Sequence, residues 1–81
     1  MINQVKIQPL NLTGKVFCEN LGLSFNGQIM QSLRELGLVN FFKVGKKYFY
    51  AYEDIETVNQ KLRNGKISIV VNNGYYITLN E

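Results

Sequence analysis

Histidine is absent from this chain of 81 residues, and Cys18 is its only cysteine. Zinc sites need several cysteine or histidine ligands, so this composition excludes them. The same lack removes the usual general base and the Cys–His and Ser–His pairs of nucleophilic catalysis. A lone cysteine also excludes a disulfide within the chain. Cys18 lies between apolar residues of a helical pattern, and we interpret it as a small buried hydrophobe, with a reactive thiol as the alternative.

Phosphate loops and membrane spans are missing as well. The glycines at 22, 27, 37, 45, 65 and 74 are scattered like turn and cap positions, and they form no glycine-rich phosphate loop. No stretch approaches the ~18 apolar residues that span a bilayer, and the chain does not open with a cationic region followed by an apolar run. We therefore expect a cytoplasmic protein that contacts no membrane, is not an enzyme and uses no cofactor or metal.

The charges are few, and their positions are more informative than their sum. Hydrophobic residues make up 46% of the chain and charged residues 19%, which is typical of one small folded domain. The net charge of +3 is compatible with a polyanionic partner without being diagnostic. Three lysines cluster at 43–47, and three carboxylates cluster at 53–56, where the start of a predicted helix favours anions.

The beginning of the chain predicts an arm followed by a short helix. Residues 1–11 alternate weakly between apolar and polar side chains, so we expect an N-terminal arm or an edge strand. Thr13 is a good N-cap for the helix, Leu12 before it is a hydrophobic staple, and Gly22 ends it. The apolar face of this helix comprises Val16, Phe17, Leu21 and Leu23.

A second helical pattern begins after Ser24 or Asn26, and the sequence leaves open which of them is the N-cap. Ile29, Leu33 and Leu36 follow at spacings of four and three, which predicts that they share a buried face. The opposite face presents Gly27, Gln28, Gln31, Arg34 and Glu35. Glutamine pairs bidentately with adenine and arginine with guanine, so this face suits a DNA major groove. An ordinary solvated helix face is the alternative.

An aromatic β-hairpin is predicted next, with Phe41–Val44 and Tyr48–Tyr52 flanking a tip of Gly45-Lys46-Lys47. Alternation places the three tyrosines of the second strand on one face, and we expect Phe49 on the other face to point inward. Lysines at a hairpin tip can reach the phosphate backbone of DNA. The alternative is that these lysines only keep an exposed turn soluble. Lys43 extends this cationic segment.

The rest of the chain predicts one more helix and a second hairpin. The helix runs from about Glu53 to Arg63, and it buttresses the core through a stripe of Ile55, Val58 and Leu62. Strands at 67–71 and 75–79 flank Asn72-Asn73-Gly74, a strong hairpin signal. Because an isolated two-stranded ribbon is marginally stable, this hairpin packs on the domain, joins the N-terminal segment or pairs with a second copy; the sequence leaves all three open.

Five short segments follow one another in a fixed order between residues 12 and 62. They are Leu12-Thr13, Leu21-Gly22-Leu23-Ser24, Lys43-Val44-Gly45-Lys46-Lys47, Tyr48-Phe49 and Glu53-Asp54-Ile55. In this order and spacing the chain resembles the excisionase-like branch of the winged-helix superfamily, which is related to the DNA-binding domains of mercuric-resistance-type regulators. Members of that family place a recognition helix between the second and third segments, and a basic wing followed by aromatics at the third and fourth.

The element order and the resemblance together predict an α+β fold, a small winged helix-turn-helix. Three short helices and a β-hairpin wing would occupy residues 12–65, and residues 66–81 would add a C-terminal β-hairpin. The helix from about Asn26 to Leu36 would enter the major groove while the wing contacts the backbone or the neighbouring minor groove. The predicted DNA-binding residues are Asn26, Gly27, Gln28, Gln31 and Arg34 on the helix and Lys43, Lys46, Lys47 and Tyr48 on the wing.

The resemblance implies a sequence-preferring double-stranded DNA-binding protein of phage or mobile-element type. The resemblance leaves two functions open. One is an excisionase, which is a recombination directionality factor with a recombinase partner, and the other is a transcriptional regulator. Several copies side by side would bend the DNA together, because one weakly basic module does not offset the cost of bending. The alternative is a winged-helix module that binds another protein and not DNA, since function follows the site and not the fold.

Overall fold

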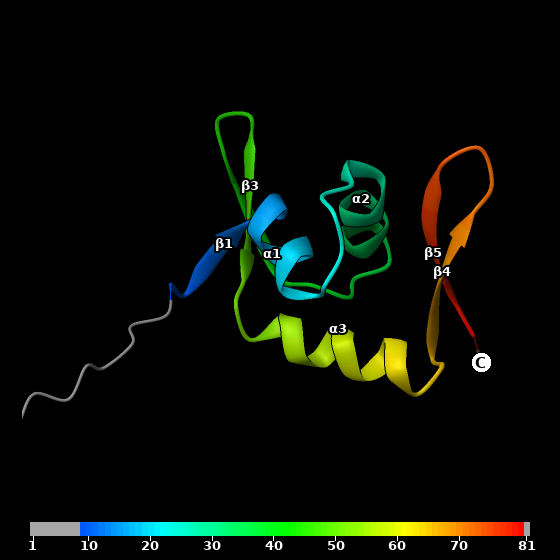
Figure 1. Ribbon diagram of the computed structural model, residues 1–81. Coiled ribbons are helices and arrows are strands. Elements are labelled where there is room, and N and C mark those ends of the chain that lie inside the picture. Colours follow the sequence, from blue (N-terminus) through cyan, green and yellow to red (C-terminus); the bar gives the residue numbers. More distant parts are fainter. Residues whose placement is uncertain (1–8, 81) are drawn as a thin grey trace, which may run out of the picture.

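Three helices and two small antiparallel sheets form residues 9–80, the part of the chain that this computed structural model describes (Figure 1). The elements in chain order are β1 (Asn11–Thr13), α1 (Gly14–Asn20), α2 (Gly27–Glu35), β2 (Phe41–Val44), β3 (Lys47–Ala51), α3 (Asp54–Arg63), β4 (Ile67–Val71) and β5 (Tyr75–Leu79). The predicted α+β class, with three short helices and two hairpins, is confirmed. The helical and alternating spacings of apolar residues are sufficient for that class because each element is amphipathic.

The central strand of the larger sheet is β3, in the order β1-β3-β2. Both neighbours run antiparallel to β3, so that Tyr50 lies opposite Leu12 on one side and opposite Phe41 on the other. Thr13 ends β1 and also caps α1, because its hydroxyl accepts a hydrogen bond of 3.4 Å from a backbone N–H of the first helical turn. Residues 1–8, which include most of the predicted arm, lie outside the described part of the chain.

Asn26 is the N-cap of α2, which decides between the two residues that the sequence left open. Its side-chain oxygen accepts hydrogen bonds from the backbone N–H groups of Gln28 at 2.9 Å and Ile29 at 3.1 Å. Ser24 therefore lies in the turn between α1 and α2, together with Phe25. The capping amide fixes where α2 begins, and with it which side chains face outward.

The apolar residues predicted for the helices are buried at Phe17, Ile29, Leu33 and Val58 and half-buried at Leu21, Leu23, Ile55 and Leu62. The prediction is wrong for Val16 and Leu36, with 38% and 37% of their surfaces exposed. Leu36 is the C-cap of α2 and lies beyond its last packed turn. Met30, which the strict spacing did not select, is buried instead, because a helix on a globular core buries a broad face. The buried apolar residues are Leu12, Phe17, Cys18, Ile29, Met30, Leu33, Val39, Tyr50, Val58, Ile67 and Ile77.

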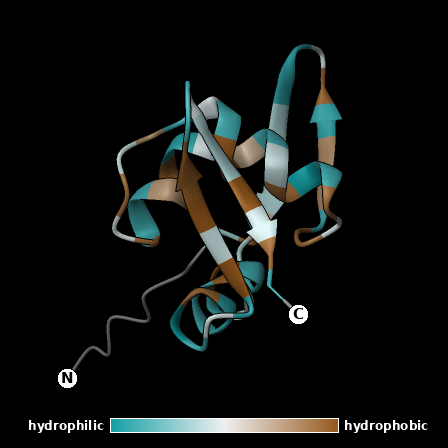
Figure 2. Cartoon of the chain, turned by 90° about the vertical axis from the view of Figure 1, so that its right-hand side faces the viewer, coloured by the Kyte–Doolittle hydropathy of each residue, from teal (hydrophilic) through white to brown (hydrophobic). Residues whose placement is uncertain are grey.

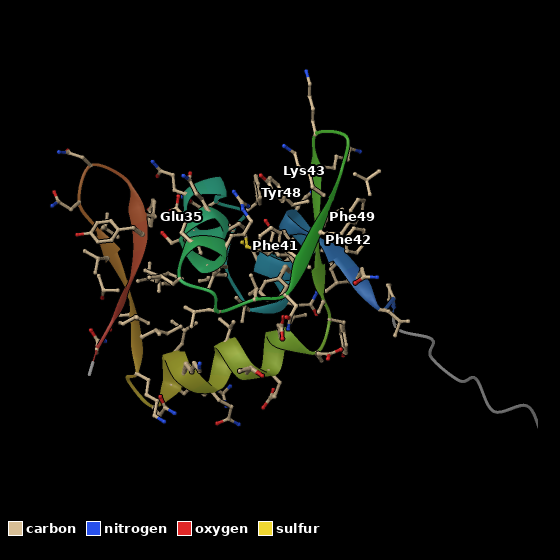
Figure 3. All side chains as sticks on the ribbon, turned by 180° about the vertical axis from the view of Figure 1, so that it is seen from behind. Glu35, Phe41, Phe42, Lys43, Tyr48 and Phe49 are labelled. Atoms are coloured by element: carbon tan, nitrogen blue, oxygen red, sulfur yellow. The ribbon has the colours of Figure 1, made fainter. Side chains whose placement is uncertain are left out.

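The inward-facing residue of β3 is Tyr50, and the prediction that Phe49 points inward is wrong. Tyr50 is 1% exposed and its ring lies 5.7 Å from that of Phe17. Phe49 instead stacks on Phe42, with ring centres 5.5 Å apart, on the face of the sheet turned away from α2 (Figure 3). The sequence pattern could not tell which face was buried, because both carry aromatics. Tyrosine is suited to the inner position when its hydroxyl has a partner, and here Arg34 is that partner.

Helix α3 lies at the end of the molecule opposite the tips of both hairpins (Figure 1). Val58 packs into the core, in agreement with the predicted stripe. Asp54, expected only to favour the helix dipole, is 8% exposed and accepts hydrogen bonds from the backbone N–H and the side-chain amide of Asn40. The carboxylate therefore ties the start of α3 to the segment that enters β2, which holds the hairpin of β2 and β3 against the helices.

The C-terminal hairpin of β4 and β5 packs on its own chain. Strand β5 contacts α2 and strand β4 contacts α3, and Ile67 and Ile77 are buried in the shared core. Figure 2 views the molecule from the side of this hairpin and shows the hydrophobic colouring along β4. The backbone N–H of Tyr75 also donates to the side-chain oxygen of Gln28 at 3.0 Å. Of the three arrangements that the sequence left open, this chain adopts the first.

Replacing Ile77 with alanine tests whether this hairpin unfolds together with the helices. The substitution leaves a cavity in the core, so we expect the free energy of unfolding to fall by about 2–5 kcal/mol. Far-UV circular dichroism and tyrosine fluorescence should report one coincident urea transition. Tyr76→Ala, an exposed position on the same strand, is the control and should change stability by only about 0.5 kcal/mol. An unchanged midpoint for Ile77→Ala would mean that the hairpin is independent of the core.

Candidate nucleic-acid interface

Helix α2 lies between the two hairpins, with β2 and β3 on one flank and β4 and β5 on the other (Figure 1). The tips of both hairpins point toward the same end of the molecule, opposite α3. Gln31 and Glu35 are exposed on α2, one turn apart, and their side chains share a hydrogen bond of 3.0 Å. The outward face of α2 is therefore bordered by one hairpin on each side. The surfaces on the two sides of the helix, which we call its flanks, differ in chemistry.

Arg34 forms the flank of α2 that faces the β2–β3 hairpin. Its guanidinium donates a hydrogen bond to the Tyr50 hydroxyl and lies over the ring of Tyr48, 3.9 Å from the ring centre. Lys43 approaches the same ring, with its Nζ 5.3 Å from the centre. Figure 3 shows Lys43 and Tyr48 on this hairpin. The quadrupole of an aromatic ring attracts a cation that lies over its face, so the stacking on Tyr48 and the hydrogen bond to Tyr50 both hold Arg34 against the hairpin.

An open cleft of about 460 Å³ lies between α2 and this hairpin, and we call it the cationic cleft. Its lining comprises Thr13, Gly14, Lys15, Phe25, Gly27, Met30, Arg34, Lys46, Lys47, Tyr48 and Tyr50. Four of these side chains are cationic, and none of the described residues in the lining is acidic. Like charges gathered around one cleft, without a carboxylate among them, raise the local potential and attract anions.

The other flank of α2 is polar and carries the helix's carboxylate. A groove of about 220 Å³, which we call the amide groove, separates α2 from the tip of the C-terminal hairpin. Its lining comprises Gln28, Gln31, Ser32, Glu35, Asn72, Asn73, Gly74, Tyr75 and Tyr76. Gln28 is engaged by the backbone of Tyr75, and a side chain at Gly74 would collide with it, since a Cβ there would lie 2.8 Å from the Gln28 oxygen.

The structure divides the predicted DNA-binding residues between these two surfaces. Gly27, Arg34, Lys46, Lys47 and Tyr48 line the cationic cleft. Gln28 and Gln31 line the amide groove. The side chain of Asn26 is used as the N-cap of α2, and Lys43 lies beside the cleft on the ring of Tyr48. Arg34 and the two tip lysines therefore meet at one place, whereas the glutamines face the other flank.

Sequence reasoning missed Lys15, Phe25 and Tyr50 as lining residues of the cationic cleft. Phe25 had a recognisable signal, because it lies in the turn between two helices and fits the apolar face of neither. Tyr50 was grouped correctly with Tyr48 by alternation but was assigned to the outer face. Lys15 had no signal in the sequence, since a lysine in the first turn of a helix is usually solvated.

Burial affects the ionisation of two side chains in this region. The pKa of Tyr50 is raised above its ordinary value because burial disfavours the phenolate, and the hydrogen bond and charge of Arg34 partly offset this rise. The pKa of Cys18 is also raised, chiefly by burial. Cys18 is fully buried and its thiol is protonated at neutral pH, which agrees with its interpretation as a small hydrophobe.

Comparison with protein-family models, with curated proteins and with solved structures found no match for this chain. What the two surfaces do therefore has to follow from their residues. Among residues 9–80, no helix has the length and apolar character that crossing a membrane requires.

Tyr50→Phe removes the hydroxyl that holds Arg34 and keeps the ring in the core. At neutral pH we expect the free energy of unfolding to fall by about 1 kcal/mol through the lost hydrogen bond. Because the folded-state pKa of Tyr50 is raised, the protonated hydroxyl stabilises the wild type below about pH 10, and this contribution is lost as the pH rises through the folded-state pKa. The stability gap between the two proteins should therefore narrow in alkaline solution.

Urea unfolding between about pH 7 and pH 11 measures this gap, with Tyr76→Phe as the control. Cys18 titrates in all three proteins and cancels from the comparison. Tyr76 is exposed, so its substitution should leave the pH profile of the wild type unchanged. Parallel profiles for the wild type and Tyr50→Phe would contradict the raised pKa of Tyr50.

Proposed function

We propose that this protein is a small winged helix-turn-helix protein that binds double-stranded DNA. In this proposal α2 is the recognition helix, and the hairpin of β2 and β3 is the wing. The observation that carries it is the convergence of Arg34 on α2 with Lys46 and Lys47 on the hairpin tip around one cleft. These cations come from segments far apart in the sequence, and the fold brings them together around this cleft.

The resemblance to the excisionase-like branch supports the same assignment. It favours a phage or mobile-element protein that acts as a recombination directionality factor beside a recombinase, or as a transcriptional regulator. Both are DNA-binding functions without catalysis, so the same interface serves either. A cytoplasmic location is part of this proposal, since that is where such DNA is found.

In this proposal the predicted contact residues have different tasks, which their positions support. Lys43, Lys46 and Lys47 are exposed, and they neutralise backbone phosphates. Arg34 is held by two tyrosines, which suits a fixed contact at the groove edge better than a flexible search for guanine. Gln31 is exposed on α2 but borders the amide groove and donates a hydrogen bond to Glu35, so in this proposal it reaches base edges from the flank opposite the lysines. Gln28 is tied to the C-terminal hairpin and supports the helix.

A protein-interaction module is the second candidate, because the hairpin of β2 and β3 also exposes an apolar face. Phe42 is 46% exposed and Val44 more so, on the side of the sheet turned away from α2. Aromatic residues in an accessible cluster are enriched in protein interfaces. This face does not include the cationic cleft, so the two candidate functions use separate surfaces of the hairpin and can be tested separately.

The double substitution Lys46→Ala/Lys47→Ala tests the wing. Affinity for mixed-sequence duplex DNA should fall, and the slope of log K against log salt should lose about 0.9 for each phosphate contact removed. Lys61→Ala/Lys66→Ala, at the far end of α3, makes the same change in net charge on the opposite side and is the matched control. Fluorescence anisotropy over a salt series gives both quantities. An equal loss in the two double variants would mean that only net charge matters.

Glu35→Gln tests whether the outward face of α2 approaches DNA. The carboxylate of Glu35 is exposed beside Gln31 and opposes a phosphate backbone, so its removal should tighten binding at low salt by about threefold. Glu56→Gln is a matched control, because Glu56 pairs with Gln60 in the same i, i+4 arrangement on α3. We expect less than about twofold change there. Equal effects of the two substitutions would mean that DNA does not approach the outward face of α2.

A further inference from the structure

The cationic cleft has an apolar interior. Binding of phosphate alone does not require such an interior. Phe25 is 55% exposed at its mouth, although it is one of the largest apolar side chains of the chain. Met30 and Tyr50 are both buried and form its floor. A volume of about 460 Å³ falls in the range of sites that enclose small ligands. A lining of this kind suits a ligand with a flat apolar surface as well as a negative charge.

Gly14 allows three side chains of this interior to pack closely together. A Cβ at this position would lie 3.3 Å from Phe25 Cε1, 3.4 Å from Met30 Cγ and 3.5 Å from Tyr50 Cε2. Phe25, Met30 and Tyr50 therefore meet around Gly14, where a side chain would press on Phe25 at the mouth of the cleft. Gly14 is in the first turn of α1 and its backbone is not left-handed, so its conformation does not require glycine. Space in the cleft is what a larger residue would remove.

The rim of the cleft supplies charge and a second flat surface. Lys46 and Lys47 come from the hairpin tip, and Lys15 comes from α1. The guanidinium of Arg34 is held on Tyr48 by stacking and on Tyr50 by a hydrogen bond. Nucleic-acid bases stack on aromatic rings and on guanidinium planes, and cations beside such surfaces bind the attached phosphates.

We infer that the cationic cleft binds one unpaired nucleotide of a DNA strand. Its base stacks on the exposed ring of Phe25 at the mouth of the cleft, and its phosphate lies on Lys46 and Lys47. The inference extends the proposed function, because it uses the same lysines, but it adds a preference for DNA in which a base has left the stack. A distorted or bulged duplex presents such a base at the lowest cost, since the base is already unpaired.

The experiment compares a mixed-sequence duplex with the same duplex carrying one extra unpaired thymidine, and it uses three proteins. The wild type should bind the bulged duplex about tenfold more tightly, within the range that stacking of one base on aromatics provides. Phe25→Ala should abolish this preference while changing affinity for the intact duplex by less than about twofold. Phe42→Ala removes an exposed ring of similar size from the other face of the hairpin and should keep the preference.

Gly14→Ala provides a second variant that fills the cleft without removing a contact residue. It should reduce the preference for the bulged duplex and keep the thermal transition, because alanine suits a helical position. Equal affinity of the wild type for the two duplexes overturns the inference, as does an equal loss of preference in Phe25→Ala and Phe42→Ala. In those cases the cleft serves paired DNA or an acidic peptide.

The failure of this inference is distinguishable from failure of the proposed function. Binding of both duplexes without preference removes the nucleotide site and leaves the duplex-binding proposal intact. Binding of the bulged duplex alone, with no detectable binding of the intact one, supports the nucleotide site and overturns the proposed recognition of paired DNA. Absence of binding to either duplex at low salt overturns both.

Discussion

The arrangement of this molecule depends on Tyr50, whose ring is buried in the core while its hydroxyl is paired with Arg34. Burial of the ring against Phe17 joins the central strand β3 to α1. The hydroxyl accepts a hydrogen bond from Arg34, which joins the same strand to α2. A phenylalanine would supply the first contact only. One side chain therefore links the packing of the fold to the position of the cation on which the cationic cleft is built.

The secondary structure of this chain was predictable because its signals are local. Caps such as Thr13, turns such as Asn72-Asn73-Gly74 and the apolar stripe of α2 depend on neighbours in sequence. The buried face of the β2–β3 hairpin was not predictable, because both faces carry aromatic residues and only the packing of α1 and α2 on one face decides between them. Such packing joins residues far apart in the sequence, so no local pattern reveals it.

The candidate site was predictable in part. The lysines of the hairpin tip and Arg34 are evident in the sequence, but their meeting depends on how α2 packs against the hairpin. The contributions of Phe25 and Lys15 come from the turn before α2 and from α1, which pattern reasoning treated as scaffold. The engagement of Gln28 by Tyr75 joins residues 47 positions apart, a separation that no local pattern reveals.

The two flanks of α2 are not equivalent, and this gives the molecule a direction. One flank is cationic and aromatic, whereas the other is lined by amides, a carboxylate and the tip of the C-terminal hairpin. A polymer lying across α2 passes these flanks in a fixed order, so the protein has two distinguishable orientations on it. Two neighbouring copies in the same orientation would place the cationic flank of one beside the amide flank of the next, whereas copies in opposite orientations would place like flanks side by side.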